Sequence, residues 1–221
     1  GDDTYIFNLG DGQDYIDDYS GAGGAYGFDT LQLGVGIAAS DITISQSSAA
    51  PNDLVISING TTDRITLADT LTSSENRIEQ IRFADGTIWS SAELVRRSMI
   101  DNAGNNSFYG SYNGETMLGG AGNDTLRARQ GNDVLVGGTG DDTLSGDEGD
   151  DTYIFNLGDG QDYIDDYSGA GGAYGFDTLQ LGVGIAASDI MISQSSAAPN
   201  DLVISINGTT DRITLADTLT N

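Results

Sequence analysis

Three residue types are missing from the 221-residue sequence: cysteine, histidine and lysine. Without cysteine the fold cannot be held by disulfides, and without cysteine and histidine the chain lacks the ligands of ordinary zinc and iron–sulfur sites. Imidazole and thiol groups are also excluded as catalytic bases and nucleophiles. We therefore expect another source of stability, and no catalysis of these common kinds.

Positive charge is scarce as well. Eight basic residues, all Arg, stand against 34 acidic ones, and the net charge is −26. A charge of this sign and size opposes binding to nucleic acid or to an anionic membrane. No apolar run approaches the roughly 18 residues of a membrane helix. We therefore expect neither nucleic acid nor membrane insertion among the functions of this chain.

Aspartate and glycine are what the sequence has in excess. Asp supplies 29 of the acidic residues and Glu five, and there are 32 Gly but two Pro. Disordered acidic segments usually favour Glu, Lys, Pro and Gln instead. The combination of Asp with Gly indicates tight turns and oxygen ligands rather than a solvated tail.

The chain repeats itself at long range. Residues 1–72 recur as 149–220 with one change, Thr43 to Met191. This copy predicts a tandem array with a 148-residue unit, and an engineered duplication is the alternative. The sequence begins at "GDDTYIF" without an initiator Met or a signal peptide, so we expect an excerpt of a longer protein.

A second repeat, of nine residues, runs from Asp101 to Ile154 in one frame. Its sixth position carries oxygen-bearing side chains: Asn106, Glu115, Asp124, Asp133, Asp142 and Asp151. Its eighth position carries apolar or aromatic ones: Phe108, Met117, Leu126, Leu135, Leu144 and Tyr153. The frame then slips by two and continues as "GDGQDYI", with Asp162 and Ile164.

Nine residues suit a tight turn of six followed by a strand of three. Glycine permits the turn, the apolar residue points inward, and successive strands then stack their carboxylates about 4.8 Å apart. Like charges so close repel one another unless a cation lies between them. Carboxylate and carbonyl oxygens are hard ligands that favour Ca²⁺. The pattern therefore predicts several bound calcium ions.

The blocks "GGAGNDTLR" and "GGTGDDTLS" match the repeat-in-toxin (RTX) nonapeptide G-G-x-G-x-D-x-U-x at every specified position. This resemblance implies a parallel β-roll with two nonapeptides per coil and Ca²⁺ between repeat n and repeat n+2. The implied ligands of the best site are Gly119, Gly120, Gly122 and Asp124 facing Gly137, Gly138, Gly140 and Asp142. A site on the opposite side is implied to use Gly131, Asp133, Gly149 and Asp151, with Asp162 continuing the series beyond the slip.

The flanks of the repeats predict short strands. Three segments, "DITISQ", "DLVISI" and "DRITLA", alternate polar and apolar residues, and Asn59-Gly60 and Asp85-Gly86 predict hairpin turns. One helix is expected near 90–99, with Ser90 and Glu93 as a capping box. This stretch resembles the haemolysin-type calcium-binding related domain.

The predicted fold is therefore all-β, a calcium-binding parallel β-roll flanked by smaller, partly antiparallel β regions. We assign the related β domain to 1–100, the roll to 101–165 and a truncated second copy of the flanking domain to 166–221.

Two further features leave alternatives open. The first is a group of aspartates beside "SGAGGAYGF", which fits either an additional calcium site or a solvated acidic loop: Asp17, Asp18 and Asp29, with their copies Asp165, Asp166 and Asp177. The second is the tyrosines Tyr15, Tyr19 and Tyr26, which could stack on a sugar of a glycan or cell-surface ligand but are more commonly core residues.

Three classes of function fit the sequence. The first, which we favour because whole domains are duplicated, is a calcium-dependent structural or adhesive module of a large secreted bacterial RTX protein, contacting neighbouring copies of itself. The second is the folding and secretion module of an exoenzyme or toxin whose active domain lies elsewhere. Catalysis by paired carboxylates is the weakest, and we predict no enzyme. Secretion would follow the type I route, to the extracellular space or cell surface.

Overall fold

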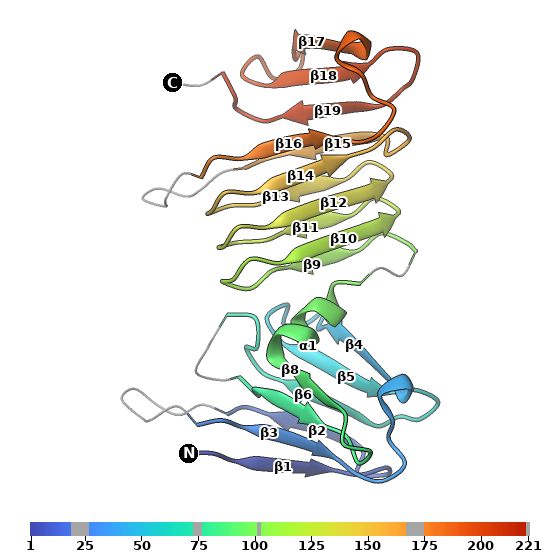
Figure 1. Cartoon of the computed structure of the whole chain (residues 1–221), viewed down its shortest axis with the longest axis vertical. Helices are drawn as coiled ribbons and strands as arrows, with labels where there is room; N and C mark the ends of the chain where they lie inside the picture. Colours follow the sequence, from blue (N-terminus) through green and yellow to red (C-terminus); the bar gives the residue numbers. More distant parts are fainter. Residues whose placement is uncertain (19–26, 73–76, 101–102, 167–174, 220–221) are drawn as a thin grey trace. The chain divides into compact units, whose positions relative to one another are not determined.

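The computed structural model describes residues 1–18, 27–72, 77–100, 103–166 and 175–219. The chain divides into two compact units, Gly1–Met99 and Ile100–Asn221. Both are built almost wholly from short strands, which confirms the all-β prediction (Figure 1). Among the described residues, no helix has the length and apolar character needed to cross a membrane.

The second unit opens with a parallel β-roll (Figure 1). Two sheets share its strands alternately, so that neighbours in a sheet are two nonapeptides apart. One sheet contains β9 (Ser107–Tyr109), β11 (Thr125–Arg127), β13 (Thr143–Ser145) and β15 (Gln161–Ile164). The other contains β10 (Thr116–Ala121), β12 (Val134–Thr139), β14 (Thr152–Phe155) and β16 (Thr178–Leu181).

The eighth residue of each nonapeptide sets the register of the roll. Leu126 pairs with Phe108 on one side and Leu144 on the other, and Met117 pairs with Leu135 in the facing sheet. All the eighth-position residues from Phe108 to Tyr153 are buried, as is Ile164 beyond the slip. The predicted apolar stack is therefore confirmed, and it forms the core between the two sheets.

The two sides of the roll are not alike in strand length. β9, β11 and β13 have the predicted three residues, whereas β10 and β12 have six because they continue through their glycines. Gly120 and Gly138 are paired in this extension. A Cβ atom at Gly138, whose φ is 98°, would overlap the Gly120 carbonyl oxygen, so glycine is required where the two coils touch.

The first unit combines parallel and antiparallel strands. One sheet has the order β1-β3-β7-β8 and the other β2-β6-β5-β4. The strands are β1 (Thr4–Phe7), β2 (Gln13–Ile16), β3 (Thr30–Leu33), β4 (Ile42–Gln46), β5 (Leu54–Ile58), β6 (Arg64–Leu67), β7 (Gln80–Arg82) and β8 (Ile88–Ser90). Both predicted hairpins are present: Gly60 joins β5 to β6 with φ of 78°, and Gly86 joins β7 to β8 with φ of 92°.

Helix α1 (Ser91–Ser98) begins where the capping signal predicts. The Ser90 hydroxyl oxygen accepts a hydrogen bond from the Glu93 N–H at 3.3 Å. In a full capping box the Glu93 carboxylate would accept the Ser90 N–H in return. Here that carboxylate pairs with Arg96 and Arg97 instead. On the apolar face of α1, Leu94 and Val95 pack into the core of the first unit.

The end of the second unit repeats the antiparallel part of the first. β17 (Ile190–Gln194), β18 (Leu202–Ile206) and β19 (Arg212–Leu215) form two antiparallel pairs, and β19 joins β15 of the roll in parallel. The strands therefore continue from the roll into the predicted 166–221 region within shared sheets.

Candidate metal centre

Two columns of carboxylates run along the roll, one at each row of turns. The first column contains Asp124, Asp142 and Asp162, and the second contains Asp133 and Asp151. Each of these side chains has 1–3% of its surface exposed. Such burial is unusual for charged groups, which are normally paired when they lie inside a protein.

Within each column the carboxylates are tied to the coil before them. The N–H of Asp124 donates to Asp142 Oδ1 at 2.7 Å, and the N–H of Asp133 donates to Asp151 Oδ1 at 2.7 Å. The N–H of Asp142 donates to Asp162 Oδ1 at 3.1 Å, across 20 residues rather than 18. The structure therefore brings together the two pairs expected from the sequence, Asp124 with Asp142 and Asp133 with Asp151, and it places Asp162 beside Asp142.

The two columns begin at the less regular blocks. The N–H of Asn106 donates to Asp124 Oδ1 at 2.7 Å, and the N–H of Glu115 donates to Asp133 Oδ1 at 2.6 Å. The Glu115 carboxylate itself turns to Ser111, where its Oε2 accepts the Ser111 N–H at 3.0 Å. Glu115 therefore closes a local turn at the N-terminal end of the second column.

The second oxygen of these carboxylates has no hydrogen-bond partner. This holds for the buried Oδ2 atoms of Asp124, Asp133, Asp142 and Asp151. Leaving a buried polar atom without a partner costs about 1–3 kcal/mol, and more for a charged group. Four such atoms at equivalent positions are suited to bind a cation. Because the donors are hard oxygens, the cation that fits them is Ca²⁺.

Glycine at the first position of a block makes room for that oxygen. A Cβ atom at Gly119 would lie 2.6 Å from Asp124 Oδ2, and one at Gly137 would overlap Asp142 Oδ2. Gly146 holds the same place against Asp151 Oδ2. Gly146 was missed among the expected site residues, although its place as the first glycine of "GDEGDDTYI" is the signal that could have identified it.

The glycines at the fourth position of the blocks serve coil stacking. Gly122, Gly131, Gly140 and Gly149 all have φ between 116° and 143°. A Cβ atom at Gly140 would overlap the Gly122 carbonyl oxygen, and one at Gly149 would overlap that of Gly131. These residues therefore lie at the turns as expected, whereas a role for their carbonyls as calcium ligands stays a prediction.

Burial raises the pKa of several column carboxylates. The pKa of Asp142 rises to about 6, that of Asp133 to about 7 and that of Asp162 to about 8. Desolvation is the largest cause in each case, and neighbouring carboxylates add to it, while hydrogen bonds from backbone N–H groups act in the opposite direction. Without a cation, part of this charge is removed by protons.

Comparison with known families agrees with this geometry. The model of the RTX calcium-binding nonapeptide repeat (4 copies) matches residues 98–126, 118–153 and 127–164. The model of the haemolysin-type calcium binding protein related domain matches residues 53–93. Residues 98–164 are RTX repeats. Both predicted resemblances are thus confirmed, and the ion of the RTX repeats is Ca²⁺.

Two solved structures are similar to the chain. One is a subunit of the mannuronan C5-epimerase from Azotobacter vinelandii, with 27% identity over 52% of this chain and 72% of that one, and a TM-score of 0.39. The other is the extracellular lipase LipA from Serratia marcescens, with 18% identity and a TM-score of 0.39. The match covers 97% of this chain but 36% of the lipase. No curated protein matches the chain in sequence.

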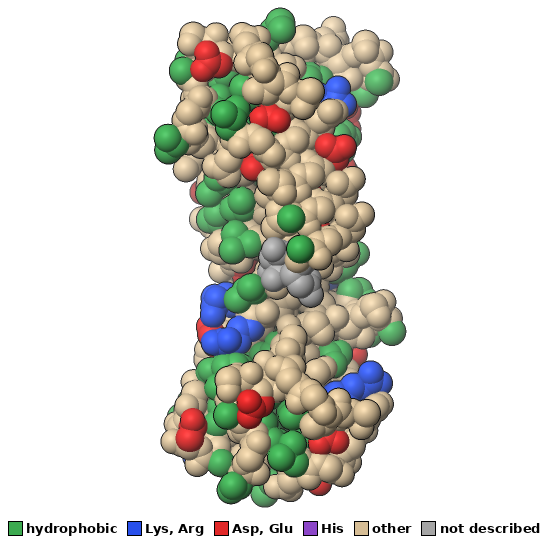
Figure 2. All heavy atoms as spheres, turned by 90° about the vertical axis from the view of Figure 1, so that its right-hand side faces the viewer, with side chains coloured by type: hydrophobic (Ala, Val, Ile, Leu, Met, Phe, Trp, Pro, Cys, Tyr) green, Lys and Arg blue, Asp and Glu red, His purple; other side chains and the backbone are tan. Residues whose placement is uncertain are grey.

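The carboxylates of the two columns lie inside the roll rather than on its surface. On the face shown in Figure 2, the acidic side chains in the upper half are scattered, and backbone and uncharged side chains cover most of the area. The five column carboxylates are therefore buried at the turns, where ions would bind.

The tyrosines considered for glycan stacking are only partly described. Tyr15 has 63% of its surface exposed, whereas Tyr19 and Tyr26 lie outside the described residues. A stacking platform for sugars therefore stays a prediction.

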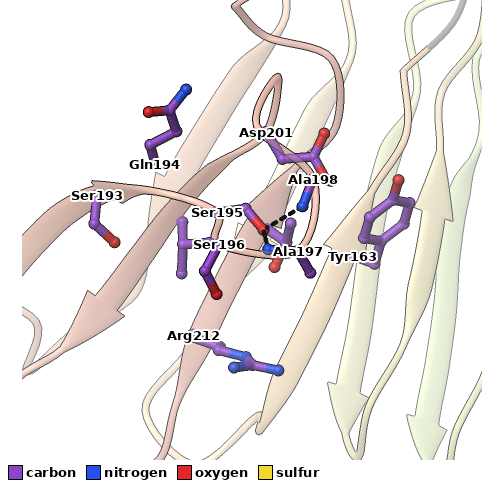
Figure 3. A pocket seen from close by; sticks show the side chains of 11 residues that line it. Tyr163, Ser193, Gln194, Ser195, Ser196, Ala197, Ala198, Asp201 and Arg212 are labelled. Carbon is purple, nitrogen blue, oxygen red and sulfur yellow. Dashed lines mark hydrogen bonds between the residues drawn. The ribbon is translucent and has the colours of Figure 1, made fainter.

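A pocket lies on the antiparallel end of the second unit, with Tyr163 of β15 on one side of it (Figure 3). The Ser195 hydroxyl oxygen accepts hydrogen bonds from the N–H groups of Ala197 and Ala198, at 3.3 and 3.2 Å. Asp201 Oδ1 accepts the N–H of Asp217 at 3.0 Å. These polar groups are engaged in holding loops, which is a structural use of the residues that line the pocket.

Proposed function

We propose that this chain is a calcium-triggered structural module, with an adhesive role, of a large secreted bacterial RTX protein. The observation that carries the proposal is the series of buried Oδ2 atoms without partners along the two columns. A calcium ion between coils supplies the missing interaction and joins two turns, so that binding free energy becomes folding free energy.

The charge of the chain supports a folding switch. At −26 the chain without ions repels itself, and the glycine-rich turns lose much conformational entropy when they are ordered. Extracellular calcium modules bind with Kd values on the order of 10⁻⁴ to 10⁻³ M. At cytosolic calcium the RTX repeats should therefore stay unfolded, as export through a channel by type I secretion requires, and they should fold outside the cell.

Duplication supports a structural or adhesive role over a role confined to secretion. Residues 1–72 and 149–220 differ at one position, so the flanking domain occurs twice, together with the last residues of the roll, 149–165. A secretion module of an exoenzyme has no need of whole repeated domains. The number of 148-residue units in the parent gene separates the two: many units favour the adhesive protein, and a single upstream enzyme domain favours the alternative.

The experiment that tests the calcium switch is a far-UV circular dichroism titration of the full chain. In metal-free buffer the RTX repeats should contribute little β signal, and millimolar Ca²⁺ should restore it cooperatively, whereas Mg²⁺ should substitute poorly because it keeps its waters. A spectrum that is fully β without calcium and does not change when calcium is added would overturn the proposal.

A pair of double variants tests where calcium acts. Asp124→Asn with Asp142→Asn removes two buried carboxylates of the first column, and we expect the calcium midpoint to rise at least tenfold. Asp14→Asn with Asp17→Asn makes the same change of charge at exposed positions of the first unit. If both double variants shifted the midpoint equally, the carboxylates would be acting through bulk charge rather than at a site.

A further inference from the structure

One side of the roll carries a pocket that the calcium columns do not use. Its volume is about 460 Å³, and small-molecule sites have volumes of roughly 300–1,000 Å³. Three successive coils supply its lining: Tyr109 and Tyr112 from the first, Arg127, Arg129 and Gln130 from the second, and Asp147 and Glu148 from the third. None of these residues belongs to the two carboxylate columns.

Most of the lining occupies positions that the RTX pattern leaves open. In G-G-x-G-x-D-x-U-x the third and ninth positions accept any residue. Tyr112, Gln130 and Glu148 hold the third position of their blocks, and Tyr109 and Arg127 hold the ninth. Arg127 pairs with Tyr109 in neighbouring strands, and Gln130 forms a parallel bridge with Glu148. The roll therefore stacks into one pocket side chains that calcium binding does not require.

The remaining lining residues break the RTX pattern at its second position. Blocks 119–127 and 137–145 have Gly120 and Gly138 there, with φ of 94° and 98°. In the pocket the same position holds Arg129 and Asp147, with φ of 81° and 69°. They are the two non-glycine residues with positive φ in the described part of the roll, 103–165. A side chain in this left-handed region strains the backbone, and such strain is concentrated at functional sites.

Arg129 is held between the backbone and an aromatic ring. Its Nη1 donates to the Gly110 carbonyl oxygen at 2.9 Å, and its guanidinium carbon lies 5.5 Å from the centre of the Tyr109 ring. Burial lowers the pKa of the Arg129 guanidinium from its usual value, because the group has lost part of its water. A ligand that accepts hydrogen bonds would replace that water.

The other polar groups of the pocket are also fixed in place. Arg127 Nε donates to Asp147 Oδ2 at 2.8 Å, and the Ser145 hydroxyl donates to Asp147 Oδ1 at 2.7 Å. Gln130 Nε2 donates to Glu148 Oε2 at 3.1 Å. Groups that are already ordered lose little conformational entropy when a ligand binds, so the pocket is pre-organised.

The opposite side of the roll has the same coils without these side chains. Its ninth positions carry Leu118, Val136 and Ile154, which lie side by side in one sheet. Its second positions carry Gly120 and Gly138. The stacking of coils therefore does not require the polar and aromatic residues of the pocket, and a ligand is a reason for their presence.

The chemistry of the lining matches that of a sugar. Tyr112 is 51% exposed and Tyr109 is half-buried, so aromatic surface is available in the pocket. A tyrosine ring offers an apolar face with a polar tip, and the C–H face of a pyranose ring packs against such a face. Carboxylate, amide and guanidinium groups each place two donor or acceptor atoms in one plane, which suits the neighbouring hydroxyls of a sugar.

We propose that this pocket binds a neutral sugar residue of an oligosaccharide. The sugar ring stacks on Tyr112, and its hydroxyls exchange hydrogen bonds with Arg129, Gln130 and Glu148. The sugar is neutral because the two arginines of the lining balance Asp147 and Glu148, and because a chain of charge −26 repels acidic saccharides. The inference rests on the adhesive role in the proposed function and names its class of ligand.

The test exposes a glycan array to the full chain in millimolar Ca²⁺. The array carries neutral oligosaccharides of glucose, galactose, mannose and N-acetylglucosamine, and acidic ones of glucuronic, galacturonic and sialic acid. We expect binding to members of the neutral set, and isothermal titration calorimetry with the strongest of them then gives the affinity. Binding to no neutral saccharide, or to acidic ones alone, would overturn the proposal.

Two variants locate the site. Tyr112→Ala removes the stacking ring, and Arg129→Gly restores the residue of the RTX pattern. Each should weaken binding about tenfold, since truncation of a central Tyr or Arg commonly has an effect of this size. Tyr15→Ala is the matched control, because it makes the same change at a tyrosine that is 63% exposed in the first unit, and the affinity should stay the same. A loss for Tyr15→Ala as large as that for Tyr112→Ala would contradict binding in this pocket.

The calcium response separates this site from the proposed function. Arg129→Gly should fold with calcium at a midpoint no higher than that of the unmodified chain, because glycine adopts positive φ without strain. Circular dichroism of the same samples measures this, so that lost sugar binding is not mistaken for lost folding. If the unmodified chain folds with calcium but binds no neutral saccharide, the sugar site is wrong and the switch stands. If it does not fold with calcium, the proposed function itself fails.

Discussion

At the scale of single residues, the same side chain has different states in the two copies. Asp14 and Asp162 both lie in "GDGQDYI". Asp162 is 3% exposed and accepts the N–H of Asp142, whereas Asp14 is exposed. In the second copy the coil that carries Asp142 stacks against Asp162, so burial of this carboxylate depends on stacking and not on local sequence alone.

This pair gives a residue-scale prediction. Asp162→Asn should raise the calcium midpoint of folding roughly tenfold or more, since a hydrogen bond to a charged group contributes about 1.5–3 kcal/mol. Asp14→Asn should change the midpoint less than about twofold. Tyrosine and tryptophan fluorescence during a calcium titration of the full chain measures both, and equal shifts would show that Asp162 is not a ligand.

At the scale of strands, the roll depends on its apolar stack. Leu135 lies between Met117 and Tyr153 in one sheet and is completely buried. Leu135→Ala should lower the free energy of unfolding by about 2–5 kcal/mol in saturating calcium, because it removes buried methyl groups and leaves a cavity. Leu118→Ala, at a position 42% exposed in β10, should cost under about 1 kcal/mol. Urea denaturation of both variants measures the difference, and similar losses would mean that the stack is not the core.

Much of this level could be predicted from the sequence. The nine-residue period fixes which strands pair and which side chains meet, and Ser90, Gly60 and Gly86 mark the helix start and the hairpins through local chemistry. The six-residue length of β10 and β12 could not be predicted, because paired glycines extend as strand only when the neighbouring coil is in contact.

The sequence indicates either an additional calcium site or a solvated acidic loop at Asp166 and Asp177, but not that both residues lie close to Asp151. Twelve residues separate β15 from Asp177, and the nine-residue period is interrupted there. Leu31 and Leu33 are buried in the first unit, whereas their copies Leu179 and Leu181 are partly exposed, and no local pattern distinguishes two identical sequences.

At the scale of the whole molecule, protons and calcium compete for the same oxygens. The pKa values of Asp142, Asp133 and Asp162 in the folded chain are about 6, 7 and 8, whereas an unfolded Asp titrates at about 3.9. The folded chain without calcium therefore binds more protons than the unfolded chain between these values. By linkage, its stability is greatest below about pH 4 as far as these groups are concerned, and it falls as the pH rises through 6 to 8.

Calcium should reverse this dependence, because the ion binds the deprotonated carboxylates and releases their protons. In metal-free buffer we expect the β signal of the RTX repeats, measured by circular dichroism, to increase when the pH is lowered from 8 to 5. At a fixed, subsaturating calcium concentration the same change of pH should weaken binding and raise the calcium midpoint. The chain with Asp133, Asp142 and Asp162 replaced by Asn should show a weaker pH dependence in metal-free buffer, since three of the buried carboxylates with raised pKa values are gone. A metal-free chain that instead gained structure between pH 5 and 8 would show that the column carboxylates are stable as unpaired charges, and that calcium is not needed to neutralise them.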